Sequence, residues 1–159
     1  MNLVIANRQR VKKINTRLFK QIVGELFCEL EIADAELGIN LVATREMTLV
    51  NETFLQHTGT TDVITFDHAE KKQAKPTHSI HGELFICVNV ALTQAKVFQT
   101  TWQAEIVRYI VHGVLHLLGY DDLKPDLRRE MKREENRLVQ LLAKKFSFAQ
   151  LSGTAKLKA

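Results

Sequence analysis

The chain has 159 residues, of which 45% are hydrophobic and 25% charged, a composition that is ordinary for one globular domain with a core of normal size. It contains no apolar run of membrane-spanning length, and its N-terminus lacks the plan of a signal peptide, so we expect a cytoplasmic protein with no membrane partner. The net charge of +4 favours an anionic partner weakly, and Cys28 and Cys87 are expected to be unpaired, buried thiols in a reducing compartment.

Five elements are predicted in the first half of the chain. Leu3 to Ala6 has the composition of a short strand, and apolar residues then recur at helical spacing from a cap at Asn15 to Leu30. Asn40 to Ala43 predicts a second strand, Thr44 to Leu55 a second helix, and the β-branched run from Thr61 to Phe66 a third strand. The second helix is expected to bury Met47, Val50 and Phe54.

The second half is predicted to be mostly helical. The polar stretch from Asp67 to Ser79 contains Pro76 and indicates a surface loop, and Leu84 to Val88 predicts a fourth strand. Val90 to Phe98 and Gln103 to Leu118 predict two helices, of which the second is the more buried.

A long amphipathic helix is predicted from Pro125 to Phe146, because apolar residues recur along one face while Arg, Lys and Glu alternate on the other. Residues 147–159 are expected to form a flexible C-terminal tail, which leaves residues 1–146 as a single domain. Strands interleaved with about five helices predict an α+β fold, an α/β sandwich in which helices pack on a four-stranded sheet.

The most informative segment lies at the end of the buried helix, where His112 and His116 are four residues apart. Side chains at this spacing project from one helix face. Gly119 is a natural stop for the helix, because glycine accepts the left-handed conformation after the cap, and the chain can then bring back a carboxylate from Asp121 or Asp122. Two His nitrogens and one Asp oxygen make a three-ligand site with an open position, which is the catalytic form of a zinc site.

Each of these residues also has an ordinary structural interpretation. A single histidine in an apolar helix is usually a hydrogen-bonded core residue, and two at this spacing occur by chance in many helices. Asp121 or Asp122 could cap the helix that Pro125 opens. The spacing alone therefore leaves a metal site and a structural role as alternatives.

The segment from His112 to Asp122 resembles the metal motif of the YbeY family, the bacterial endoribonucleases of ribosomal RNA maturation, which reads H-G-x-L-H-L-x-G-Y-D-H. Every fixed position agrees except the last, where the family's third histidine falls on Asp122. Three further segments are similar to the family, so that the resemblance covers about residues 40 to 140; they are Asn51–Phe66, Gly82–Ile86 and Glu105–Ile110.

The resemblance implies a small mixed sheet with one antiparallel strand and a metal-binding helix like that of the zincins. It implies one zinc ion per chain, held by His112, His116 and Asp122, and cleavage of single-stranded RNA at that ion. It also implies a role in ribosomal RNA processing and in ribosome maturation or quality control. Ribosomal RNA, the small ribosomal subunit and one of that subunit's proteins are the partners that the resemblance suggests.

Two departures from the family pattern affect the expected chemistry at the metal. Asp122 adds a negative charge where a third imidazole would be neutral, which should make the metal a weaker Lewis acid and attract a phosphodiester less strongly. Leu55 aligns with the family's arginine, a residue type that can clamp a transition-state phosphate, and His57 could replace it only in part.

The motif contains no evident general base. In H-E-x-x-H metalloproteases a glutamate follows the first histidine, but this chain has Gly113 there, which argues against a zinc-dependent peptidase. Asp62 and Asp121 are the candidate catalytic carboxylates, although strand-end hydrogen bonding and helix capping explain them at least as well. The two departures leave a ribosome-associated assembly factor with little catalysis as the main alternative to a nuclease.

The remaining candidate residues are interpreted as structural. His68, His78 and His81 are expected to be loop residues, and Trp102 is expected to be a packing residue rather than a platform on which a base stacks. Basic residues are most simply read as solvated faces, with RNA contact as the alternative. They concentrate in Arg8–Lys20, Lys71–Lys75 and Lys124–Lys145.

Overall fold

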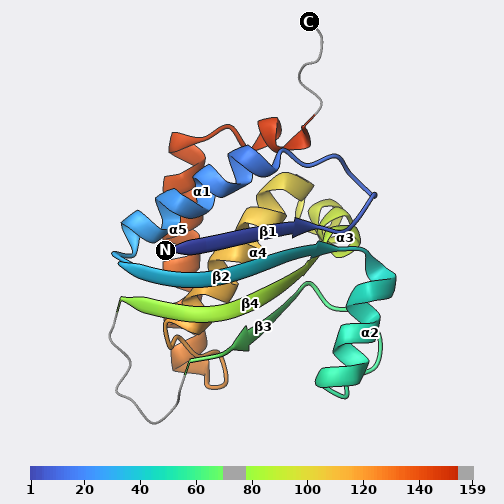
Figure 1. The fold of residues 1–159 in the computed structure, drawn as a ribbon, viewed down its shortest axis with the longest axis horizontal. Coiled ribbons are helices and arrows are strands. Elements are labelled where there is room, and N and C mark those ends of the chain that lie inside the picture. The colour runs from blue at the N-terminus through green and yellow to red at the C-terminus, as the bar shows by residue number, and fades with distance from the viewer. Residues whose placement is uncertain (70–77, 154–159) are drawn as a thin grey trace, which may run out of the picture.

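The computed structural model describes residues 1–69 and 78–153, so that Pro76 and the basic run Lys71–Lys75 lie outside the described residues. Within these ranges the chain forms four strands, five α-helices and one 3-10 helix (Figure 1). None of these helices is both long and apolar enough to cross a membrane. In chain order the elements are β1 Asn2–Asn7, α1 Thr16–Glu29, β2 Asp34–Val42, α2 Thr44–Phe54, β3 Val63–Asp67, β4 Ser79–Cys87, α3 Val88–Phe98, α4 Trp102–Leu117, α5 Pro125–Lys145 and the 3-10 helix η1 Phe148–Ser152.

The four strands form one mixed sheet in the order β1-β2-β4-β3. β1, β2 and β4 are parallel, whereas β3 runs antiparallel to β4 with Ile64 opposite Phe85. Parallel neighbours need a crossover connection, and α1 provides it between β1 and β2. The predicted α+β fold, with a four-stranded mixed sheet and one antiparallel strand, is confirmed.

The two faces of the sheet carry different layers, because side chains alternate between the faces along each strand. Leu84 of β4 belongs to the main core, which α1, α4 and α5 form with one face of the sheet. In Figure 1 the strands pass in front of α4 and α5. Ile64 and Phe85 belong to a smaller cluster on the other face, with Met47 of α2 buried among its members. The main core therefore supports α4, the helix with the two histidines.

The structure differs from the sequence-based boundaries mainly at the strands. β2 begins at Asp34 and β4 at Ser79, several residues before the predicted starts at Asn40 and Leu84. Buried and exposed residues alternate in the early part of both strands, because only one sheet face is covered there, and this alternation dilutes the apolar signal. Phe54, predicted to be buried, is 66% exposed because it is the last residue of α2; its ring forms a T-shaped contact with Phe66.

The C-terminal segment is folded further than predicted. Residues 148–152 form η1, whose Leu151 is buried in the main core and accepts a hydrogen bond from the backbone N–H of Asn15 at 2.9 Å. The structure thus corrects the expected flexible tail over residues 148–152, while residues 154–159 lie outside the described part of the chain. Cys87 is buried as expected, but Cys28 is exposed on the outer face of α1.

Candidate metal centre

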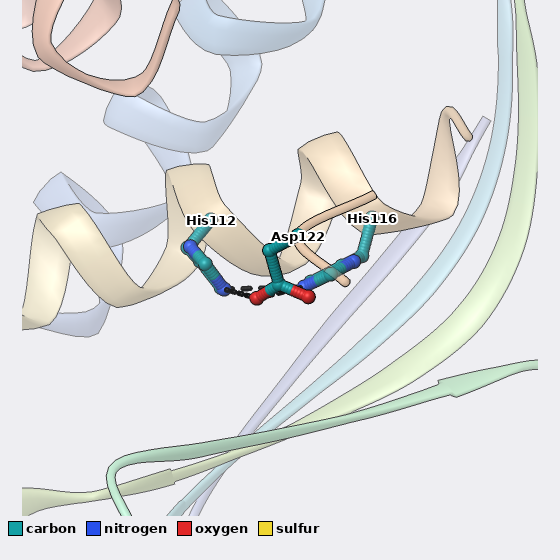
Figure 2. Close-up of side chains that lie close together, drawn as sticks. All are labelled: His112, His116 and Asp122. Carbon is teal, nitrogen blue, oxygen red and sulfur yellow. Dashed lines mark hydrogen bonds and ion pairs between the residues drawn. The ribbon is translucent and has the colours of Figure 1, made fainter. Parts of the chain in front are cut away.

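Helix α4 ends in a Schellman motif that reverses the chain. Gly119 has φ +108°, its N–H donates to the His116 carbonyl oxygen, and the Tyr120 N–H donates to the Leu115 carbonyl oxygen, both at 3.0 Å. Glycine adopts this positive φ without the steric cost that a Cβ atom would bring. The reversal leads the chain back along the helix, so that Asp122 arrives beside the two histidines (Figure 2).

The side chains of His112, His116 and Asp122 converge on one point. In Figure 2 both rings project from the same face of α4, and the carboxylate lies over the gap between them. The two Nε2 atoms are 3.2 Å apart, and Oδ2 of Asp122 lies 3.8 Å from the first and 3.6 Å from the second. Among the described residues, no other group of three or more His, Cys, Asp or Glu side chains is arranged to hold a metal ion.

Hydrogen bonds to the other ring nitrogens fix the tautomers of both histidines. Nδ1 of His116 lies 3.1 Å from the carbonyl oxygen of Tyr120, which can only accept, so Nδ1 carries the proton. Nδ1 of His112 lies 2.7 Å from Oε1 of Glu135 on α5 and donates to it in the same way. Both Nε2 atoms therefore present lone pairs on the side where Asp122 lies, which is the usual arrangement of metal-ligating histidines.

Glu135 is a buried carboxylate next to the candidate metal ligands. Burial by itself raises the pKa of this carboxyl, but hydrogen bonds from His112 and Arg108 outweigh burial and lower the pKa to about 2. Nη1 of Arg108 donates to Oε2 at 2.6 Å, and Nζ of Lys132 lies 3.3 Å from the same oxygen. Glu135 is therefore ionised at neutral pH, and its carboxylate orients the His112 ring through the hydrogen bond to Nδ1.

The three donor atoms fit a divalent cation. Tetrahedral zinc with ligand distances of about 2.0–2.1 Å has about 3.3 Å between neighbouring ligands. The three donor separations here, 3.2, 3.6 and 3.8 Å, are close to that value. Without a cation, two imidazole lone pairs and a carboxylate would face one another with no positive charge between them. Two nitrogens and one oxygen suit zinc and also other transition metals, and three protein ligands leave a coordination position open.

Asp62 lies close to this cluster. It immediately precedes β3, and with His112 and Asp122 it lines two cavities, one on each side of the cluster. Oδ1 of Asp62 accepts a hydrogen bond from the N–H of Val63 at 2.7 Å, so the strand-end role considered from the sequence is also present. The second carboxylate oxygen can still face a ligand from this position.

Asp121 lies apart from the cluster. Its Oδ1 accepts a hydrogen bond from the N–H of Leu123 at 2.9 Å within the same loop, and the residue lines a separate cavity near the end of α4. Neither Asp121 nor Asp122 caps α5, because the N-cap residue of that helix is Lys124. Of the two adjacent aspartates, the structure thus brings only Asp122 to the histidines.

Gly113 follows the first histidine, where a metalloprotease has its glutamate, and the fold leaves no room for a side chain there. A Cβ atom at this position would lie 2.6 Å from Cδ2 of the fully buried Leu84 on β4. Helix α4 therefore packs closely on the sheet between the two histidines, and a glutamate at this position would require the buried Leu84 side chain or the helix to move.

Leu55 lies at the C-terminal end of α2 and is 39% exposed. Together with Asp62 and the three candidate ligands it lines a cavity of about 460 Å³ on the α2 side of the cluster. An apolar side chain thus occupies the wall from which an arginine could reach a bound phosphate. His57 is not among the residues that line this cavity, and its backbone N–H donates to the Asn51 carbonyl oxygen at 3.3 Å.

The other candidate residues lie in different places. The rings of His68 and His81 are 5.6 Å apart, and each pairs with a glutamate, Glu83 for the first and Glu36 for the second. His81 is part of β4 and not of a loop. Trp102 is the first residue of α4 and packs partly buried against the main core, which agrees with a packing role.

Glu135 is the site residue that sequence reasoning missed. It lies in the apolar stripe of α5, four residues after Met131 and three before Leu138, both of which are buried. A charged residue in a buried stripe requires a partner, and this pattern could have identified Glu135 as a candidate site residue. The partner itself could not be predicted from the sequence, because Glu135 and His112 are 23 positions apart.

Comparison with known proteins identifies the family of this chain. The family model described as Endoribonuclease YbeY matches residues 4–143. The Endoribonuclease YbeY of Parabacteroides distasonis is 41% identical over 93 residues, which are 58% of this chain and 61% of that protein. The Endoribonuclease YbeY of Chlorobium luteolum is 34% identical over 146 residues, which are 89% of this chain and 98% of that protein. A solution structure of a Thermotoga maritima protein has the same fold, with a TM-score of 0.66 and 22% identity over 99% of each chain. Because the family model and the Chlorobium alignment each extend over most of the sequence, the chain belongs to the YbeY endoribonuclease family.

Proposed function

We propose that this protein is a metal-dependent endoribonuclease that cleaves single-stranded RNA in ribosomal RNA processing and in ribosome maturation or quality control. The observation that carries the proposal is the convergence of His112, His116 and Asp122 beside two open cavities, in a chain of this family. Both relatives are named endoribonucleases, which supports RNA as the substrate.

In this proposal His112, His116 and Asp122 hold one zinc ion per chain. When bound, such an ion supplies a Lewis acid that activates water and offsets the charge that develops on the phosphate. Glu135 and the Tyr120 carbonyl oxygen hold the two rings in orientation, because each accepts a hydrogen bond from an Nδ1 atom and leaves Nε2 for the ion.

Asp62 is the proposed general base. Its position in the wall of both cavities beside the candidate ligands supports this role, because a carboxylate there can accept a proton from a water molecule that attacks the phosphate. Asp121 is less suited to this role, because it bonds within its own loop and lines a different cavity. The proposed partners are single-stranded ribosomal RNA and the small ribosomal subunit with one of its proteins. With these partners, the proposed location of the protein is the cytoplasm.

The test compares the wild-type protein with His116→Ala. We expect the wild type to carry about one metal ion per chain and to cleave single-stranded RNA, and the variant to lose both the metal and the cleavage. His81→Ala is the control, because His81 pairs with Glu36 away from the cluster. Elemental analysis gives the metal content, and labelled RNA gives the rate; undiminished cleavage by metal-free His116→Ala would contradict the proposal.

A second candidate function is a ribosome assembly factor with little catalysis. It is favoured by Leu55, because this side chain provides no charge for a phosphate in the cavity that it shares with the candidate ligands. The same His116→Ala variant separates the two: normal ribosomal RNA maturation in cells that contain only this variant would favour binding over chemistry. A peptidase is disfavoured, because Gly113 stands where the usual glutamate base would be, and a side chain there would clash with Leu84.

A further inference from the structure

A large cavity opens on the α5 side of the three candidate ligands. Its volume is about 690 Å³, within the size range of small-molecule binding sites, and Asp62, His112 and Asp122 form part of its wall. The other walls come from the end of α3, the middle of α4 and the first half of α5. A ligand in this cavity would therefore lie next to a phosphate held at the candidate metal site.

The α5 wall of the cavity carries positive charge. Arg128 and Lys132 are four residues apart and share one helix face, and both are exposed side chains that line the cavity. Nε of Arg128 donates to the backbone carbonyl oxygen of Asp122 at 3.3 Å, so the guanidinium lies beside the loop that carries this candidate ligand. Lys132 has a 63% exposed side chain, so its ammonium group can turn from Glu135 toward a ligand.

Two buried acidic groups of the cavity already have partners within the protein. Glu135 binds His112 and Arg108, and the exposed Lys132 lies 3.3 Å from it, whereas Arg128 contacts a backbone carbonyl oxygen. Glu105 is buried and accepts a hydrogen bond from the Thr100 hydroxyl at 2.8 Å.

The α3 wall of the cavity carries an exposed aromatic ring. Phe98 is the last residue of α3, which ends because Gln99 adopts the left-handed conformation with φ +56°. The Phe98 side chain is 63% exposed and lines the cavity, whereas the neighbouring Val97 is 65% exposed and is not among the lining residues. A ring and a row of cations around one cavity are the two features that proteins combine to bind single-stranded nucleic acids.

We propose that this cavity holds one unpaired nucleotide of the RNA next to the scissile phosphate, with its base stacked on Phe98 and its phosphate bound by Arg128 and Lys132. This inference rests on the proposed nuclease function and gives a physical cause for its preference for single strands. A base must leave a duplex before its face can lie on Phe98, so a paired nucleotide is not accommodated. An acidic peptide could use the cations but would leave the ring without a planar partner, so a nucleotide is the occupant that these walls favour.

The experiment measures binding of a fluorescein-labelled, single-stranded 2′-O-methyl hexanucleotide, which resists cleavage, by fluorescence anisotropy with zinc present. Phe98→Ala should weaken binding about tenfold, because one stacking contact is lost. Lys132→Ala should reduce the slope of log K against log salt by about 0.7, the contribution of one phosphate contact on a single strand. Val97→Ala and Arg133→Ala are the matched controls, since each is an exposed neighbour outside the cavity wall, and both should bind within twofold of wild type.

Cleavage of the corresponding RNA is measured in parallel. Phe98→Ala should raise KM while leaving kcat and the bound metal unchanged, which separates a substrate contact from a damaged metal site. If the wild type cleaves RNA and Phe98→Ala binds and cleaves equally well, the nucleotide cavity is refuted while the nuclease function stands. If the wild type neither binds nor cleaves RNA, both proposals fail. A hexaglutamate peptide that binds the wild type but not Lys132→Ala, with no oligonucleotide binding, would overturn the nucleotide assignment.

Discussion

The candidate metal ligands depend on a residue that does not touch the metal position. His112 is held by Glu135, and Glu135 is in turn held by Arg108, so that two hydrogen bonds to one buried carboxylate link α4 to α5. The ion pair of Arg108 with Glu135 is desolvated on the glutamate side, where the side chain is 5% exposed. Such outer partners commonly fix the orientation and basicity of a ligating imidazole.

Glu135→Gln should therefore lower the affinity for zinc about 10- to 100-fold, because an amide oxygen still accepts the Nδ1 proton of His112 but no longer carries a negative charge. Competition with a chromophoric chelator measures this affinity. Glu134→Gln is the matched control on the same helix, since Glu134 pairs with Arg137 instead of a histidine. Equal zinc affinity in the wild type and Glu135→Gln would show that the charge of Glu135 has no part in the site.

The sequence indicated the convergence of the candidate ligands better than their supports. Helix periodicity and one glycine stop predicted that His112 and His116 share a face to which Asp121 or Asp122 returns, and the family resemblance selected Asp122, which the structure brings to the two histidines. Glu135 reaches the site only through the packing of α5 on α4, and no local pattern encodes that packing. The exposure of Phe98 likewise depends on where α3 ends in space, which the apolar pattern of α3 does not reveal.

The end of helix α4 sets the geometry of the candidate metal site. The Schellman motif determines both the Tyr120 carbonyl that fixes one imidazole and the path that returns Asp122. Both depend on the positive φ of Gly119, around which there is open space for a Cβ atom. The constraint at this position is therefore conformational and not steric crowding by neighbours.

Gly119→Ala should destabilise the protein by about 1–3 kcal/mol through backbone strain and should also weaken zinc binding. The same substitution at Gly24, inside α1 and also with open space around it, should instead stabilise by about 0.5–1 kcal/mol, because alanine is the better helix former. Urea unfolding of both variants gives the two free energies. Opposite signs are expected, and a neutral Gly119→Ala would refute the role of its backbone conformation.

The predicted elements were correct where one periodicity dominated. α5 begins at Pro125 as predicted, and Asn15 caps α1 by accepting a hydrogen bond from the Leu18 N–H at 3.1 Å. β2 and β4 were predicted too short, because their early residues alternate between core and solvent and only their later parts are rich in apolar residues. η1 was missed because its one buried anchor, Leu151, packs on residues far away in sequence.

The candidate metal site connects elements that are separate in the fold. Two ligands lie on the buried helix α4, the third lies in the loop before α5, and Glu135 connects the site to α5 itself. An ion held at this site would bind the folded chain and not the unfolded one. Its binding free energy would therefore add to the stability of the entire domain.

Zinc should raise the unfolding temperature of the wild-type protein. At a free concentration of 100 times the dissociation constant, binding to the folded state alone adds about 2.7 kcal/mol. For a domain of this size that corresponds to an increase in Tm of about 5–10 °C. Thermal unfolding followed by circular dichroism, with zinc or with EDTA, measures the shift. His81→Ala should keep the full shift, because His81 lies on the sheet beside Glu36, whereas His116→Ala should lose it. A shift that persists in His116→Ala would place the bound zinc elsewhere and remove the physical basis for the proposed chemistry.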